Sequence, residues 1–230
     1  MKETIFSSAY FGVVISISAY ALGFFVKRKL KAGFLNPLVV AVVVVITFLL
    51  AAGVSYESYN VGGKYISYLL TPATVCLAIP LYQQLALLKK YKKAVVIGIL
   101  AGVLSSLGSV LALSYLFGLS HEQYVTLLPK SITMAIGIGV SNELGGIQAI
   151  TVASIAVTGI LGNMLGPAVC RLFKIREPIA AGLALGTASH AFGTVKALEM
   201  GEVQGAMGSL SIVVAGLITV VGASFFAYLL

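Results

Sequence analysis

Charged residues are scarce in this chain. They make up 10% of its 230 residues, whereas a soluble domain carries about 25%. So few charges cannot cover a water-facing surface, which excludes an ordinary soluble domain. Hydrophobic residues reach 59% and form blocks near the length of about 20 residues that a helix needs to cross a bilayer. Six blocks are predicted to cross fully: about Phe6–Val26, Asn36–Gly53, Tyr65–Leu88, Ala94–Phe117, Ile147–Phe173 and Gly205–Leu230.

Cysteine and the common catalytic motifs are also sparse. Cys76 and Cys170 lie far apart inside apolar blocks, which argues against a disulfide framework or a metal site. The sequence has no phosphate-binding glycine loop, no GxSxG and no metal-ligand spacing. We therefore expect no enzyme, no cofactor and no bound metal.

Positive charge is plentiful and clustered. Net charge is +8, and eleven of the fifteen Lys and Arg fall in three short runs: Lys27, Arg28, Lys29 and Lys31; Lys89, Lys90, Lys92 and Lys93; Arg171, Lys174 and Arg176. Each run borders an apolar block, so the positive-inside rule explains it better than a nucleic-acid surface. All three runs are predicted to face the cytoplasm.

The order of these runs limits the path of the chain. Three apolar candidates lie between the second and third runs, and three crossings would put the third run outside. One candidate must not cross, and residues 125–146 are the best choice because they are short and contain Pro129 and several glycines. The glycine-rich Ile179–Met200 has the same character and follows a cytoplasmic run. We predict two interrupted or re-entrant helical segments that enter from opposite faces.

The two interrupted segments are related in sequence by a shift of 56 residues. The pattern E-Φ-G-x-Φ-Q, with Φ apolar, begins at Glu143 and again at Glu199. The fold prediction is therefore an all-α polytopic membrane protein with one transmembrane domain over residues 1–230 and inverted units at about 125–173 and 179–230. Inverted repeats with interrupted helices are a recurring plan of secondary transporters.

Polar residues gather on both interrupted segments. The predicted substrate-binding residues are Lys130, Ser131, Thr133, Thr187, Ser189, His190 and Thr194. An ionisable group at membrane depth is costly, which favours a functional role, and helix ends with hydroxyls and a cation suit a small anion. Two structural alternatives stay open: Lys130 reaches toward the headgroups, or His190 packs against a neighbouring helix.

Other polar residues are assigned roles outside the predicted binding set. Glu143 and Glu199 are candidates for helix capping, and Glu143 and His190 are candidates for proton coupling. Four residues are predicted to interrupt the third apolar block and to act as scaffold beside the site without binding substrate: Thr71, Pro72, Thr74 and Pro80.

Three runs resemble the LrgB/CidB family, and its CidB-like branch in particular: TPATVCLAIPLYQQL, LLPKSITMAIGIGVSNELGG and GLALGTASHAFGTVKALEMGEVQGA. The resemblance implies one of two functions. Bacterial members are described as holin- or antiholin-like proteins that modulate murein hydrolase activity, lysis and programmed cell death beside a small LrgA/CidA-type membrane protein. Relatives that include the plastid glycolate/glycerate translocator and bacterial pyruvate systems carry small carboxylates.

Inverted units and a buried polar cluster fit a carrier better than a lesion-forming holin. We expect a secondary carrier or facilitator for a small monocarboxylate such as pyruvate, in the bacterial cytoplasmic membrane. The alternatives are a regulator of murein hydrolases and lysis, and a non-transporting partner of an LrgA/CidA-type subunit. A homodimer in the lipid bilayer is expected, with no nucleic-acid partner.

Overall fold

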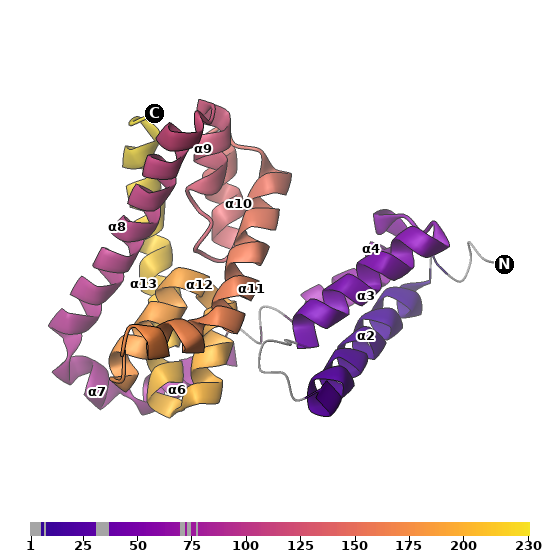
Figure 1. Ribbon diagram of the computed structural model, residues 1–230, viewed down its shortest axis with the longest axis horizontal. Coiled ribbons are helices and arrows are strands. Elements are labelled where there is room, and N and C mark those ends of the chain that lie inside the picture. Colours follow the sequence, from indigo (N-terminus) through magenta and orange to yellow (C-terminus); the bar gives the residue numbers. More distant parts are fainter. Residues whose placement is uncertain (1–5, 7, 31–36, 70–71, 73–74, 77) are drawn as a thin grey trace. The chain divides into compact units, whose positions relative to one another are not determined.

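The computed structural model describes the chain except for residues 1–5, 7, 31–36, 70–71, 73–74 and 77, and the regular structure of the described part is helical (Figure 1). The chain forms two compact units, Met1–Cys76 and Leu77–Leu230. Both predicted repeat units fall within the second compact unit.

Three helices of the described part of the first unit touch through small residues. They are α2 (Ala9–Leu30), α3 (Pro37–Ala52) and α4 (Tyr56–Ser67). A Cβ atom on Gly12 of α2 would lie 2.6 Å from the backbone nitrogen of Gly63 in α4. Beside this contact the Ser16 and Tyr59 hydroxyls are 2.8 Å apart. Close backbone packing and hydrogen bonds between side chains stabilise helix association in lipid, where burial of apolar surface contributes little free energy.

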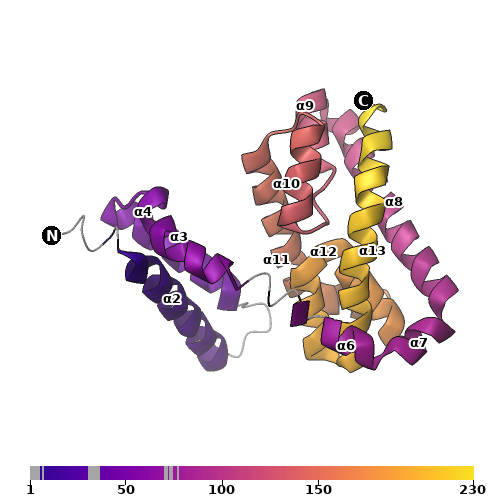
Figure 2. The same ribbon diagram turned by 180° about the vertical axis from the view of Figure 1, so that it is seen from behind.

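The second unit contains eight described helices: α6 (Ala78–Gln83), α7 (Leu85–Lys90), α8 (Lys92–Phe117), α9 (His121–Leu127), α10 (Met134–Glu143), α11 (Gln148–Leu172), α12 (Pro178–Met200) and α13 (Glu202–Ala227). Two opposite views show α8 and α13 running the length of the unit (Figures 1 and 2). The short helices α9 and α10 lie at one end, and α6, α7 and α12 lie at the other. The basic residues of α7 and of the α11–α12 connection therefore share one end of the unit.

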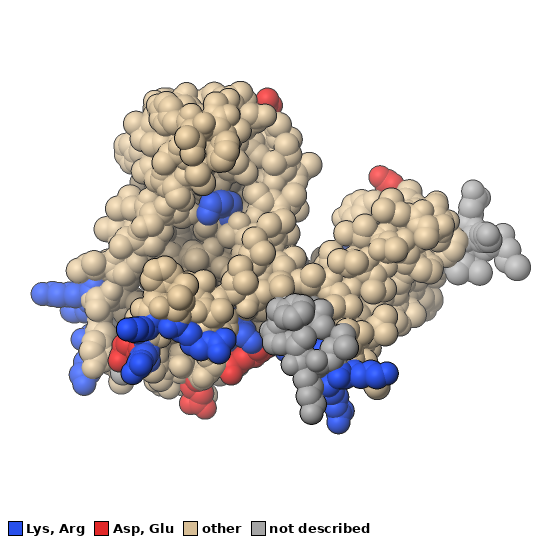
Figure 3. Space-filling model, in the orientation of Figure 1, with Lys and Arg blue, Asp and Glu red and all other residues tan. Residues whose placement is uncertain are grey.

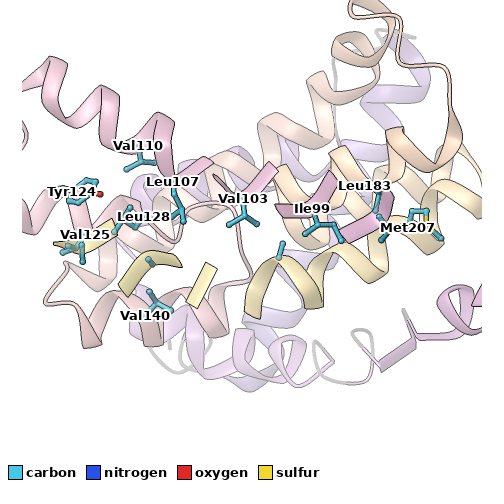
Figure 4. Close-up of a cluster of buried hydrophobic side chains, with 14 of the residues drawn as sticks. Ile99, Val103, Leu107, Val110, Tyr124, Val125, Leu128, Val140, Leu183 and Met207 are labelled. Atoms are coloured by element: carbon cyan, nitrogen blue, oxygen red, sulfur yellow. The ribbon is translucent and has the colours of Figure 1, made fainter. Parts of the chain in front are cut away.

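Helix α8 has a buried row that anchors the core of the second unit. Ile99, Val103 and Leu107 recur every four residues and are 0%, 3% and 1% exposed, as expected for one face of a helix. They pack in one cluster with Leu183 of α12 and Met207 of α13 (Figure 4). Through this row, α8 packs against both α12 and α13.

The segment from α9 to α10 is an interrupted helix, as predicted. Helix α9 ends at Leu127, Pro129 follows, and turns continue until α10 begins after Thr133. Proline lacks the N–H that a continuing helix needs. Hydroxyls tie the two sides of the break together, because Thr151 of α11 bonds Ser141 of α10 at 2.6 Å and the carbonyl of Thr126 in α9 at 3.0 Å.

Helix α12 is also interrupted, inside its range. Ser189 (φ −139°, ψ 21°) and His190 (φ 42°, ψ −132°) are not helical. The shift of 56 residues that relates the two sequences relates Thr133 and Met134, where α10 begins, to these two positions. It also relates Gly145 to Gly201, which follow the two segments but differ in backbone conformation: φ is 80° at Gly145, whereas Gly201 is extended, with φ 159° and ψ 164°.

The number of long helices differs from the prediction of six crossings. Four described helices are long and apolar enough to span a membrane, at Ala9–Lys29, Lys92–Phe117, Gln148–Leu172 and Glu202–Ala227, and α3 is a shorter apolar helix. The block Tyr65–Leu88 is not one spanning helix, because α4 ends at Ser67 and the short α6 and α7 follow.

The scaffold residues predicted in that block have separate outcomes. Thr71 and Thr74 lie outside the described residues, and Pro72 is exposed. Pro80 is the third described residue of α6, and it follows helical Val75 and Cys76 with residue 77 outside the described part.

The capping prediction for the two repeated glutamates is wrong. Glu143 is the last residue of α10, and the next helix has Ile147 at its N-cap with no side-chain cap. Glu199 lies inside α12 and pairs with Lys196 at 2.6 Å. Both acids end the interrupted segments and do not begin the spans that follow.

Candidate functional site

A cavity of about 940 Å³ lies in the second unit between α8, α11, α12 and the break before α10. Figure 3 shows a hollow on this face of the unit, with basic atoms inside it and further basic atoms gathered at the α6–α7 end. The polar lining residues within the membrane helices and the break are Ser105, Ser106, Ser109, Lys130, Ser131, Thr158, Thr187 and Ser189. Tyr91 and Glu177 also line it, so the cavity extends toward the end that carries the basic runs.

Lys130 supplies the positive charge of this cavity. Its ammonium group donates to the hydroxyls of Ser106 at 3.4 Å and Ser131 at 3.3 Å, and these two hydroxyls are 2.9 Å apart. The described residues contain one ion pair, between Lys196 and Glu199, so none of their carboxylates lies within ion-pair distance of Lys130. A half-buried cation held by two hydroxyls is well suited to an anionic group.

Helix α12 contributes two further hydroxyl residues to the cavity lining. Thr187 and Ser189 both line the cavity and are 5% and 2% exposed. The Thr187 Oγ1 atom is buried and has no hydrogen-bond partner among the described residues. The Thr187 side chain therefore borders the cavity, but its hydroxyl oxygen has no surface open to a ligand there.

Three predicted site residues are placed outside the cavity lining. The His190 ring lies against α11, with Nε2 3.2 Å from the Ile155 carbonyl and the ring 5.5 Å from that of Phe192. Thr194 is buried against Gly208 of α13, and Thr133 begins α10. The structure thus brings together Lys130, Ser131, Thr187 and Ser189, whereas His190 takes the packed position that the sequence left as an alternative.

The serine row of α8 was missed by sequence reasoning. Gly98, Gly102, Ser105, Ser106 and Ser109 all line the cavity. Their spacing of three or four residues marks one face of a helix, directly beside the apolar row that enters the core. That spacing was the available signal, and it went unused because α8 is apolar around most of its circumference.

The two candidates for proton coupling, Glu143 and His190, are far from equivalent. Glu143 is exposed at the end of α10, and His190 is buried. Neither lines the cavity. Among the described residues no group of three or more His, Cys, Asp or Glu gathers to hold a metal ion.

Comparison with known proteins identifies the family. The profile of the LrgB-like family matches residues 16–229. The chain belongs to the LrgB-like family. Its family resemblance is thereby confirmed, and the narrower CidB-like branch stays a prediction. The LrgB-like chain is also a membrane protein, in agreement with its four long apolar helices.

Relatives of the same family match along nearly their whole length. An antiholin-like protein LrgB of Bacillus subtilis (strain 168) is 41% identical over 224 residues, which cover 97% of this chain and 97% of the relative. Proteins of the same name from Bacillus mycoides (strain KBAB4) and Bacillus cereus (strain B4264) are each 41% identical over 213 residues, covering 92% of this chain and 93% of each relative. No solved structure matches the chain.

Proposed function

We propose that this LrgB-like protein is a secondary carrier or facilitator for a small monocarboxylate of the pyruvate or glycolate type. The observation that carries the proposal is Lys130, a cation with no described carboxylate within ion-pair distance, held by hydroxyls in the cavity. One cation suits one carboxylate, and hydroxyls suit the remaining oxygens of a short acid. No bond of the substrate is made or broken, so the protein acts as a transporter and not as an enzyme.

The two interrupted segments supply a means of movement in this proposal. We infer that they are inverted repeat units, since their breaks are related by the same shift as their sequences. Both breaks border the cavity, through Ser131 and Ser189. Movement of the two segments against α8 would alternate access to the site, as in other carriers built from inverted repeats. The bacterial cytoplasmic membrane and a homodimer belong to the same proposal.

A second candidate function rests on the relatives. Their name, antiholin-like protein LrgB, favours a regulator of murein hydrolase activity and lysis that acts with an LrgA/CidA-type partner. In that case the cavity need not bind a substrate, and any permeation should be an unselective leak.

Purified protein in liposomes separates these functions. A carrier gives pyruvate uptake that saturates with concentration, while liposomes loaded with a small neutral solute such as glycerol retain it. A pore releases glycerol and gives uptake that rises in proportion to pyruvate concentration. A protein that neither transports nor leaks alone, but supports saturable uptake with an LrgA/CidA-type protein, is a subunit of a joint carrier.

A further inference from the structure

A second hollow lies on the first two turns of α8. It is a groove of about 360 Å³ whose described lining is two consecutive lysines and the two residues one turn later: Lys92, Lys93, Val96 and Ile97. The large cavity is lined from the same turns by Tyr91, Ala94 and Gly98. Because successive residues of a helix point in different directions, the groove and the large cavity lie on separate faces of α8.

The groove opens onto an apolar stripe of α8. Val96 and Ile97 are 53% and 65% exposed. Leu100 and Leu104, which are also exposed, follow Val96 at intervals of four residues and continue the same face. Helix α8 is long and apolar enough to span a membrane, so this stripe meets lipid. From Val96 to Leu104 it offers an acyl chain about 12 Å of apolar surface along the helix.

The other end of the groove carries two positive charges. Lys92 and Lys93 are exposed, and each lies four residues before Val96 or Ile97, on the same face. The one ion pair among the described residues lies elsewhere, so no described carboxylate is within ion-pair distance of either ammonium group. Long lysine side chains place their apolar stems along a groove and their charges in water.

We propose that Lys92, Lys93, Val96 and Ile97 form a binding site for an anionic phospholipid. The two ammonium groups hold the phosphate of the headgroup, and one acyl chain follows the apolar stripe of α8. Each lysine near a membrane surface strengthens binding of anionic lipid about fivefold. This site lies outside the large cavity and does not depend on the proposed carrier function.

The response of thermal unfolding to added lipid tests this site. Purified protein in a neutral detergent is titrated with phosphatidylglycerol, which is anionic, and with phosphatidylcholine, which has no net charge. A ligand that binds the folded state raises the unfolding temperature, so we expect a saturable rise with phosphatidylglycerol and a much smaller one with phosphatidylcholine. In Lys92→Gln/Lys93→Gln, the mole fraction of phosphatidylglycerol that gives half of the rise should increase about 30-fold.

Two variants serve as controls. Lys27→Gln/Lys29→Gln removes the same charge from the last turn of α2, in the other compact unit, and should change the half-saturating mole fraction by less than about twofold. Lys130→Met alters the large cavity and should leave the response to phosphatidylglycerol unchanged. Should Lys92→Gln/Lys93→Gln fail to fold, Lys93→Gln alone should show an increase of about fivefold.

Three results would overturn the proposal. Equal responses to phosphatidylglycerol and phosphatidylcholine would show that the headgroup charge is not recognised. An equal effect of the two double lysine variants would show that net charge acts without a site on α8. An equal rise with glycerol phosphate, which has the headgroup phosphate and no acyl chain, would show an anion site that binds no lipid.

Discussion

Replacement of Lys130 by Met should weaken substrate binding without weakening the fold. Methionine keeps an unbranched side chain and removes the ammonium group. A hydrogen bond to a charged group contributes about 1.5–3 kcal/mol, which corresponds to roughly 10- to 150-fold in affinity. The folded protein loses only two contacts of 3.3 and 3.4 Å to neutral hydroxyls. The substitution removes a poorly compensated charge from a half-buried site, so we expect the free energy of unfolding to fall by less than about 1 kcal/mol or to rise.

Two measurements on the same preparation test this prediction. The concentration of pyruvate that gives half-maximal uptake should rise in Lys130→Met, while the thermal unfolding temperature in detergent stays near that of wild type. Lys196→Met is the control, since Lys196 is paired with Glu199 and lies outside the cavity lining, and its half-maximal concentration should not change. Unchanged pyruvate affinity in Lys130→Met, or a large loss of stability with no specific effect on affinity, refutes the role assigned to Lys130.

The remaining predictions concern the crossing of α11 with the break in α12. Gly162→Ala should destabilise the protein by about 1–3 kcal/mol, because a Cβ atom there would collide with the Ser189 hydroxyl. The control Gly108→Ala should instead stabilise it by about 0.5–1 kcal/mol, because a Cβ atom at that position of α8 meets no neighbour within 4 Å. Equal shifts in unfolding temperature for the two variants would contradict the described crossing. His190→Ala should lower the free energy of unfolding by about 1–3 kcal/mol, because the buried ring bonds an α11 carbonyl. Pyruvate affinity of the protein that remains folded should change less than threefold. A larger loss of affinity at unchanged stability would show that His190 belongs to the binding site.

Local chemistry made the interrupted segments predictable. Pro129 removes a helical donor, and the glycines around the second break permit close backbone contacts, so both breaks fall where the sequence indicated. The sequence also indicated Lys130, Ser131, Thr187 and Ser189, because polar and ionisable groups at membrane depth favour a functional role. These features depend on residues close together in the sequence.

Features that depend on distant residues were not predictable. The position of the His190 ring follows from a positive φ of 42° and from the placement of α11 beside it, and the sequence alone determines neither. The polar face of α8 becomes a cavity wall only because its neighbouring row, Ile99, Val103 and Leu107, is held by α12 and α13. The described part of Tyr65–Leu88 divides into the end of α4, α6 and α7, which agrees with the interruption expected from its two prolines, but apolar content does not give the positions at which these helices end.

Protection of a cysteine placed in the cavity tests the central claim, that a small monocarboxylate binds beside Lys130. Ala188 and Ala180 are both exposed and line the cavity on α12, and eight residues of helix separate them by about 12 Å. In a background of Cys76→Ser and Cys170→Ala, the rate of maleimide labelling is measured for Ala188→Cys and Ala180→Cys. We predict that pyruvate slows labelling of Ala188→Cys in a saturable way, that glycerol does not, and that Ala180→Cys reacts at the same rate with and without pyruvate. Equal rates for Ala188→Cys at every pyruvate concentration would contradict the account.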